Sequence, residues 1–201
     1  MTESQFLMLQ FLTSASLVII VVAITVSDVR ERRIPNRFVL AGLFIAMIWH
    51  VSAPQGLGLF DAYTAGGLGL TSSLMGAGMC FGVFLVLHVL GVMGAGDVKL
   101  MAFMGALFGA NHSVDLIVTV LLCGGVLAAT RMIGGGRFVR VISNLKLIVL
   151  DRMLAPTGGA IFDPEKDTVE RLPFALAICS AAVLLAFAQQ KGMSLPWAFY
   201  G

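Results

Sequence analysis

Two aspartates are the residues of this sequence whose type and surroundings could do chemistry. Asp28 follows the apolar run Phe6–Val26, and Asp97 stands in the glycine-rich turn G-V-M-G-A-G-D-V-K-L. An ionisable residue at a membrane span is costly and points to function. Two carboxyls held close together share a proton, so one can activate water as a base while the other protonates a carbonyl oxygen or leaving amine. Such a pair can hydrolyse an amide without a metal or a covalent intermediate.

Simpler roles exist for both aspartates. Asp97 could cap the helix that follows it, because Asp is a good N-cap and negative charge suits the positive end of a helix. Asp28 would lie near a helix C-terminus, where carboxylates are disfavoured, but it could pair with an arginine of the D-V-R-E-R-R stretch that it begins. Gly94 and Gly96 suit a catalytic turn, since glycine permits unusual turns and lets a substrate backbone come close.

The composition predicts the elements that must position these residues. Of 201 residues, 58% are hydrophobic and 12% charged, and the mean hydropathy is +0.95. These values indicate an integral membrane protein. The first apolar run is not expected to be a cleavable signal peptide, because no Lys or Arg precedes it and no small-residue cleavage site follows it. The three cysteines stand alone, so neither a metal site nor a disulfide framework is expected.

The hydropathy pattern predicts an all-α, polytopic membrane protein with about six transmembrane helices, each needing roughly 20 apolar residues. The expected spans are Phe6–Val26, Phe38–Val51, a glycine-rich span within Ala62–Val92, Val98–Ala110, Val114–Ile133 and Leu172–Gln189. Glycines of the third span would let neighbouring helices approach closely. His88, deep in the same span, is expected to be a hydrogen-bonded packing residue rather than a proton shuttle. The connection 134–171 is expected to hold an amphipathic helix on the membrane surface, followed by a loop.

The basic residues predict the orientation. With six spans, 12 of the 13 Lys and Arg residues fall on one side of the membrane, and Lys191 alone falls on the other. By the positive-inside rule the first side is cytoplasmic and both termini lie outside. The net charge of +2 therefore reflects topology, and no nucleic-acid partner is expected. Asp28 and Asp97 are then predicted to share the cytoplasmic face, although 69 residues separate them.

Three sequence elements resemble one family. D-V-R-E-R-R-I-P-N begins at Asp28, G-A-G-D-V-K-L-M begins at Gly94, and R-L-P-F-A begins at Arg171. In this order, and over essentially Phe6–Gln189, they resemble the type IV prepilin peptidases, a family of GxGD membrane aspartic proteases. In that family an aspartate followed by a basic stretch closes one span, and the GxGD motif opens another.

The resemblance implies a membrane aspartic endopeptidase that removes a short basic leader from prepilins or pseudopilins at the cytoplasmic membrane face. Asp28 and Asp97 would be catalytic, while Gly94 and Gly96 would shape the motif. Lys99 matches a frequent family position and would bind substrate or shape the motif; the alternative is a lysine that only anchors the topology near the headgroups. The implied location is the bacterial or archaeal cytoplasmic membrane, with the lipid bilayer and other pilus assembly proteins as partners. No metal and no cofactor are expected.

The sequence also departs from the larger members of that family. They carry an insertion with paired CxxC motifs and methylate the new pilin N-terminus, whereas this chain has no CxxC. It resembles the short form associated with tight-adherence (Flp-type) pili, with residues 1–201 forming a single peptidase domain. N-methyltransferase activity is therefore not expected. Ala175 follows Phe174 where many relatives have glycine.

Two other functions compete with this prediction. A small proton- or cation-coupled transporter could use the same two aspartates, although transporters place ionisable groups near the bilayer midplane. A non-enzymatic pilus assembly subunit could use them only as caps or ion-pair partners. A further expectation concerns the acidic residues of 163–170, which could attract a basic leader; a merely solvated loop is the alternative.

Overall fold

The computed structural model describes residues 3–61, 65–91, 93–134 and 174–193. The chain divides into two compact units, residues 1–124 with 173–201 and residues 125–172, and each is considered by itself. The predicted surface helix and acidic loop of the 134–171 connection lie outside the described residues, apart from Gly134 at the end of a helix.

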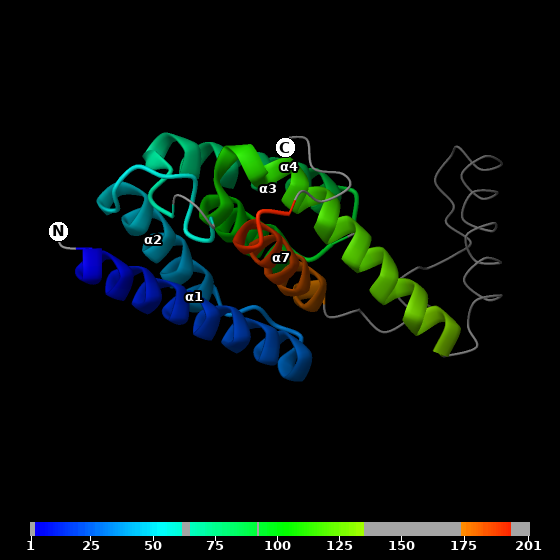
Figure 1. Cartoon of the computed structure of the whole chain (residues 1–201). Helices are drawn as coiled ribbons and strands as arrows, with labels where there is room; N and C mark the ends of the chain where they lie inside the picture. The colour runs from blue at the N-terminus through cyan, green and yellow to red at the C-terminus, as the bar shows by residue number, and fades with distance from the viewer. Residues whose placement is uncertain (1–2, 62–64, 92, 135–173, 194–201) are drawn as a thin grey trace, which may run out of the picture. The chain divides into compact units, whose positions relative to one another are not determined.

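Apart from two isolated β-bridges, the regular secondary structure of the described residues is helical. The helices are α1 (Glu3–Glu31), α2 (Asn36–Ser52), α3 (Gly69–Val89), α4 (Ala95–Gly134) and α7 (Phe174–Gln190) (Figure 1). Three described segments are long and apolar enough to cross a membrane: Ser4–Glu31, Gly69–Val89 and Ala95–Thr130. Helices α2 and α7 are apolar but shorter. The all-helical class and the membrane character are therefore confirmed. The number of six spans stays a prediction.

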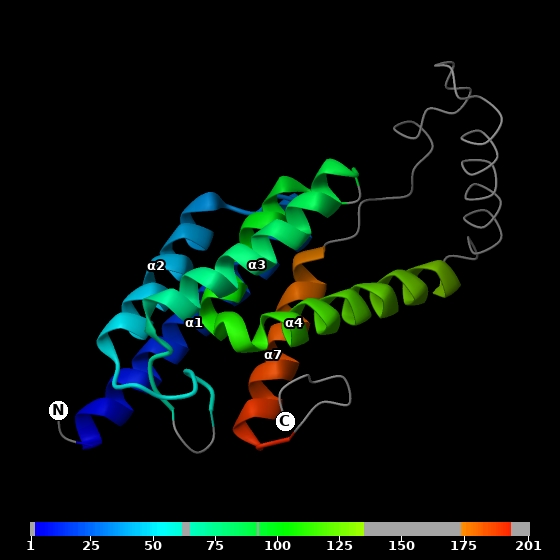
Figure 2. The same ribbon diagram turned by 90° about the horizontal axis from the view of Figure 1, so that it is seen from above.

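Helices of the first unit pack as a bundle (Figure 2). Helix α1 contacts α2 and α7, and α2 contacts α3. Helix α4 lies close to α2, because a Cβ on Gly42 would come within 2.6 Å of the Phe103 ring. Large apolar side chains such as Phe11 and Ile19 remain exposed on α1, as expected for a surface that faces lipid rather than water.

The expected spans Val98–Ala110 and Val114–Ile133 leave Asn111–Ser113 as the connection between them, and this position is wrong. Those residues are helical, and the break within α4 lies at Gly109, with φ 75° and ψ 179°. Only glycine adopts this backbone conformation readily. The predicted fourth and fifth spans thus correspond to the two parts of α4 before and after Gly109.

Side chains from α2 and α3 satisfy the backbone groups that the break at Gly109 leaves unpaired. In a continuous helix the Ala110 N–H would donate to the Ala106 carbonyl. Here the Ala110 N–H donates to Ser72 Oγ at 3.2 Å, and Ser73 Oγ donates to the Ala106 carbonyl at 2.9 Å. Such pairing is needed in a membrane, because hydrocarbon offers no alternative partner.

His50, at the end of α2, joins this break to the 53–68 connection. Its Nδ1 accepts a hydrogen bond from the Leu68 N–H at 3.2 Å, so the proton is on Nε2, which donates to the Leu107 carbonyl at 3.0 Å. The connection also lies near the start of α1, where Gln10 donates to the Leu59 carbonyl. Within this unit the first residues of α1 and the 53–68 connection therefore lie at one end, and the connection from α1 to α2 lies at the other (Figure 1).

Candidate functional site

Both aspartates line one cavity of about 310 Å³. The cavity lies where the α1–α2 connection meets the turn before α4, two segments that are distant in the sequence. It also contains the other three residues singled out by the sequence. Its complete lining is Asp28, Arg32, Arg33, Ile34, Asn36, Gly94, Gly96, Asp97 and Lys99.

Asp28 lies in the last turn of α1, slightly earlier in the helix than expected, and only 7% of its surface is exposed. Its Oδ2 accepts a hydrogen bond from the Ala175 N–H at 3.2 Å. Ala175 is the second residue of α7, so its amide is one of the four at a helix start that have no partner within the helix. The positive end of α7 thus holds a carboxylate that the C-terminus of α1 alone would disfavour.

Asp97 is the third residue of α4 and is half-buried. Its Oδ2 accepts a hydrogen bond from the Gly94 N–H at 3.3 Å, while its own N–H donates to the Gly94 carbonyl at 3.1 Å. Asp97 therefore stabilises the turn at the start of α4. Its carboxyl also interacts electrostatically with that of Asp28. Asp97 therefore both caps α4 and lies in the same cavity as Asp28.

The two glycines of the G-A-G-D turn are closely packed. A Cβ on Gly94 would lie 3.3 Å from Asp97 Oδ2, and a Cβ on Gly96 would lie 3.1 Å from the Cβ of Ile34. Ile34 belongs to the α1–α2 connection, which follows Asp28. The absence of a side chain at Gly96 therefore brings the turn that holds Asp97 against the segment that follows Asp28.

A polar contact joins the same two segments. Lys99 Nζ donates a hydrogen bond to Asn36 Oδ1 at 3.1 Å. Asn36 is the first residue of α2, after a reversal in which Arg32 adopts a φ of 53°. Lys99 and Asn36 are both exposed, and both line the cavity. Lys99 thus links the G-A-G-D turn to the I-P-N segment.

Two hydrogen bonds at the site have partners that the sequence does not predict. One is the bond from the Ala175 amide to Asp28. The other involves His88, which lies in the last turn of α3 rather than deep in the span and donates from Nδ1 to the Met93 carbonyl at 2.8 Å. Its prediction as a hydrogen-bonded residue is confirmed. The identity of its partner depends on how the loop folds, which the apolar pattern does not specify.

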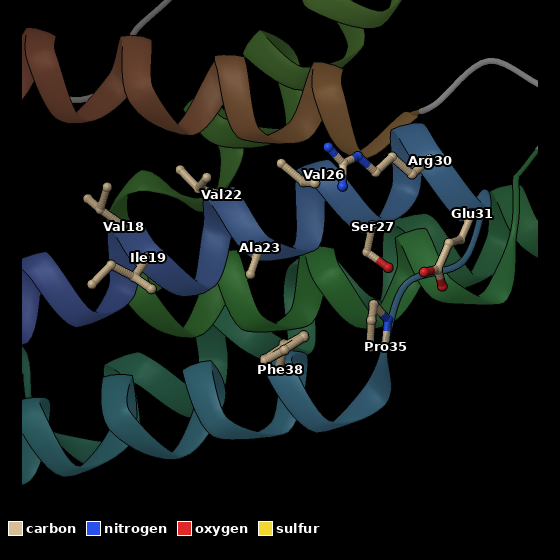
Figure 3. A pocket seen from close by; sticks show the side chains of 10 residues that line it. All are labelled: Val18, Ile19, Val22, Ala23, Val26, Ser27, Arg30, Glu31, Pro35 and Phe38. Atoms are coloured by element: carbon tan, nitrogen blue, oxygen red, sulfur yellow. The ribbon is translucent and has the colours of Figure 1, made fainter.

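A larger groove of about 660 Å³ runs along α1 and the start of α2 (Figure 3). Its walls are mainly apolar, with Ser27, Arg30 and Glu31 as the polar residues. Neither aspartate of the candidate site lines it. Figure 3 shows Phe38 and Pro35 on its α2 side. The groove is therefore distinct from the cavity that holds the two carboxyls.

Within the described part of the chain, no group of three His, Cys, Asp or Glu residues is placed to hold a metal ion. The expectation of a metal-free reaction stays a prediction. The arrangement offers instead two carboxyls, three cationic side chains and closely approaching backbone around one open space. That set can bind a polar chain segment and transfer protons.

Comparison with known proteins places the chain in a family. No curated protein and no solved structure gives a significant match. Residues 15–129, more than half of the chain, match the profile described as the Type IV leader peptidase family. The matched segment includes both Asp28 and Asp97 and runs through most of the described α4. The chain therefore belongs to the type IV leader peptidase family, and it is a peptidase with the apolar helices of a membrane protein.

Proposed function

We propose that the chain is a membrane aspartic endopeptidase that removes the leader from type IV prepilins, of the Flp type, at the cytoplasmic membrane face. The observation that carries this proposal is the meeting of Asp28 and Asp97 in one cavity. Family membership supports peptidase chemistry, and the two carboxyls provide the groups that a metal-free hydrolysis needs.

The proposed reaction begins with the two carboxyls sharing one proton, since like charges at close range cannot both ionise cheaply. The ionised carboxyl takes a proton from water as the oxygen attacks the scissile carbonyl carbon. The protonated carboxyl gives its proton to the carbonyl oxygen. The carboxyl that took the proton from water then gives it to the amide nitrogen, while the other carboxylate takes a proton from a hydroxyl of the tetrahedral intermediate; the C–N bond breaks, the new amine and a carboxyl product leave, and both aspartates return to their starting state.

The cavity suits a short stretch of extended substrate. About 310 Å³ is near the lower end of the range for ligand pockets, and it can hold a few backbone atoms and a water, whose share of liquid volume is about 30 Å³. Gly94 is exposed and leaves the backbone accessible beside Asp97. The apolar helix that follows the cleavage site of a prepilin would remain in the bilayer.

The lining of the cavity is cationic around the carboxyls, with Arg32, Arg33 and Lys99. A basic leader would therefore find little attraction there beyond the aspartates. We propose that acidic residues of the 163–170 segment supply the attraction for a basic leader. Neutralising Asp163, Glu165, Asp167 and Glu170 together should weaken processing of a basic leader more than that of a leader with its charges removed. Unchanged processing of the basic leader by the neutralised variant rules this role out.

The central test is co-expression of the chain with a candidate prepilin, with processing followed as a change in pilin size. Asp28→Asn and Asp97→Asn should each abolish cleavage, because loss of general acid–base catalysis costs about 10²- to 10⁴-fold or more. Glu31→Gln is the matched control: Glu31 lies one turn from Asp28 on α1 but lines the separate groove. It should leave cleavage intact.

Membrane abundance of each variant shows whether folding and insertion are preserved. Cleavage by either Asn variant at the wild-type rate contradicts the two-aspartate mechanism. Failure of the wild-type chain to process any prepilin contradicts the proposed substrate, while the family assignment stands.

A further inference from the structure

The peptide group between Met93 and Gly94 is hydrogen-bonded at both ends. Its carbonyl oxygen accepts from His88 Nδ1 at 2.8 Å. Its N–H, on Gly94, donates to Asp97 Oδ2 at 3.3 Å. One peptide plane therefore connects the imidazole of His88 to the carboxyl of Asp97.

The direction of these bonds follows from the groups involved. A carbonyl oxygen can only accept, so His88 Nδ1 carries a proton. Hydrogen bonds at the two ends of one amide reinforce each other, because accepting at the oxygen makes the N–H a better donor. The bond from His88 thus fixes the orientation of the Met93–Gly94 plane and strengthens the N–H that Asp97 accepts.

The end of α3 is built to allow this contact. The Leu90 N–H donates to the Val86 carbonyl and the Gly91 N–H donates to the His88 carbonyl, which closes the helix. Gly91 then has a φ of 76°, in the left-handed region that favours glycine. The chain turns back at this point, and the Met93 carbonyl comes within reach of the His88 ring.

We propose that His88 is a positioning residue for Asp97, acting through the Met93–Gly94 peptide group. This inference rests on the proposed function, in which Asp97 is one of the two proton-transferring carboxyls. His88 itself does not contact the substrate. It holds the donor that fixes the Asp97 carboxyl, so its loss lowers the rate of the chemical step rather than the affinity for prepilin.

Two amide side chains distinguish this role from simple packing. The amide nitrogen of asparagine can occupy the place of His Nδ1, whereas that of glutamine corresponds to Nε2. His88→Asn should therefore retain the bond to the Met93 carbonyl, and His88→Gln and His88→Leu should lose it. His112→Leu is the control, because His112 lies beyond the Gly109 break and its described contact is with Asp115.

The experiment measures kcat and KM of the full-length chain in proteoliposomes with a purified prepilin. We expect His88→Leu and His88→Gln to lower kcat about three- to tenfold with KM unchanged, the effect of one lost hydrogen bond. His88→Asn should recover kcat to within about twofold, and His112→Leu should match the wild type. Amide hydrogen exchange of the 89–97 segment should quicken in the Leu and Gln variants only.

Equal kcat for the Asn, Gln and Leu variants overturns the proposal, whether all are slow or all are unimpaired. A rise in KM without a fall in kcat also overturns it, because it assigns His88 to substrate binding. If His88→Leu does not accumulate, the comparison of the Asn and Gln variants decides alone. Activity of Asp97→Asn would instead refute the proposed function, a result that leaves the His88 hydrogen bond itself untouched.

Discussion

Each aspartate of the candidate site has a backbone amide at a helix start as its partner. Asp97 accepts from Gly94 just before α4, and Asp28 accepts from Ala175 at the start of α7. Helix N-termini favour negative charge, so both positions stabilise a carboxylate. A cap role is compatible with the proposed catalytic role, because the capping bonds fix the positions of the two carboxyls.

A prediction at this scale concerns the Lys99–Asn36 hydrogen bond. Lys99→Met and Asn36→Ala should each lower kcat/KM about two- to fivefold, because a hydrogen bond between exposed groups contributes about 0.5–1 kcal/mol. The double variant should be no slower than either single variant, since both remove the same bond. Asn36→Asp should retain activity, because its carboxylate can still accept from the lysine.

Cleavage kinetics of the four variants check this coupling. Additive losses in the double variant would show that Lys99 and Asn36 act separately. A loss of kcat/KM in Asn36→Asp as large as that in Asn36→Ala would also contradict the role of the hydrogen bond.

At the scale of elements, the break in α4 depends on side chains from its neighbours. His50 is 2% exposed and pairs with both the Leu107 carbonyl and the Leu68 N–H. We expect His50→Phe to lower the free energy of unfolding by about 1–3 kcal/mol for each backbone group left unpaired. His112→Phe, at a half-buried position beyond the break, should change it much less.

Thermal unfolding in detergent measures both histidine variants. Similar unfolding temperatures for His50→Phe and His112→Phe would contradict the role assigned to His50. The result does not depend on enzymatic activity, so it tests the fold alone.

Glycines of α3 provide a second prediction for packing. A Cβ on Gly76 would meet the Gly105 carbonyl oxygen and would come within 2.6 Å of the Gly109 carbonyl carbon. Backbone cannot move aside as a flexible side chain can, so Gly76→Ala should destabilise by about 1–3 kcal/mol. Gly78 has open space at its Cβ position, and Gly78→Ala should be neutral or slightly stabilising, because alanine favours helix. Unfolding in detergent compares them, and equal stability of both variants would contradict the close α3–α4 contact.

Hydropathy alone predicts where the helices lie, because each helix is a long apolar run that contacts either lipid or the other helices. It misplaces the break in α4: Asn111 and His112 are polar and suggest a turn, but the backbone needs glycine conformation at Gly109. Charge counting and motif order predict that the two aspartates share one face of the membrane, but not that they line one cavity. The Ala175 amide and the partner of His88 are not predicted either, because main-chain partners leave no pattern in the side chains.

Orientation is a property of the whole molecule and stays a prediction. Lys and Arg are concentrated on one predicted side of the membrane, the side preferred by the positive-inside rule. Within the first unit, the cavity lined by Arg32, Arg33 and Lys99 lies at the end where α1 passes to α2, while the 53–68 connection lies at the opposite end (Figure 1). The two ends therefore provide separate positions for labelling.

Single cysteines at these ends test the orientation, after Cys80, Cys123 and Cys179 are replaced by alanine. Gln55 lies in the 53–68 connection and Glu31 at the end of α1, and both are exposed. In intact spheroplasts a membrane-impermeant maleimide should label Gln55→Cys and should reach Glu31→Cys only after permeabilisation. The reverse pattern would place the two aspartates outside the cell, where they could not remove a leader on the cytoplasmic side. Orientation thus decides whether the proposed chemistry and the proposed substrate can meet.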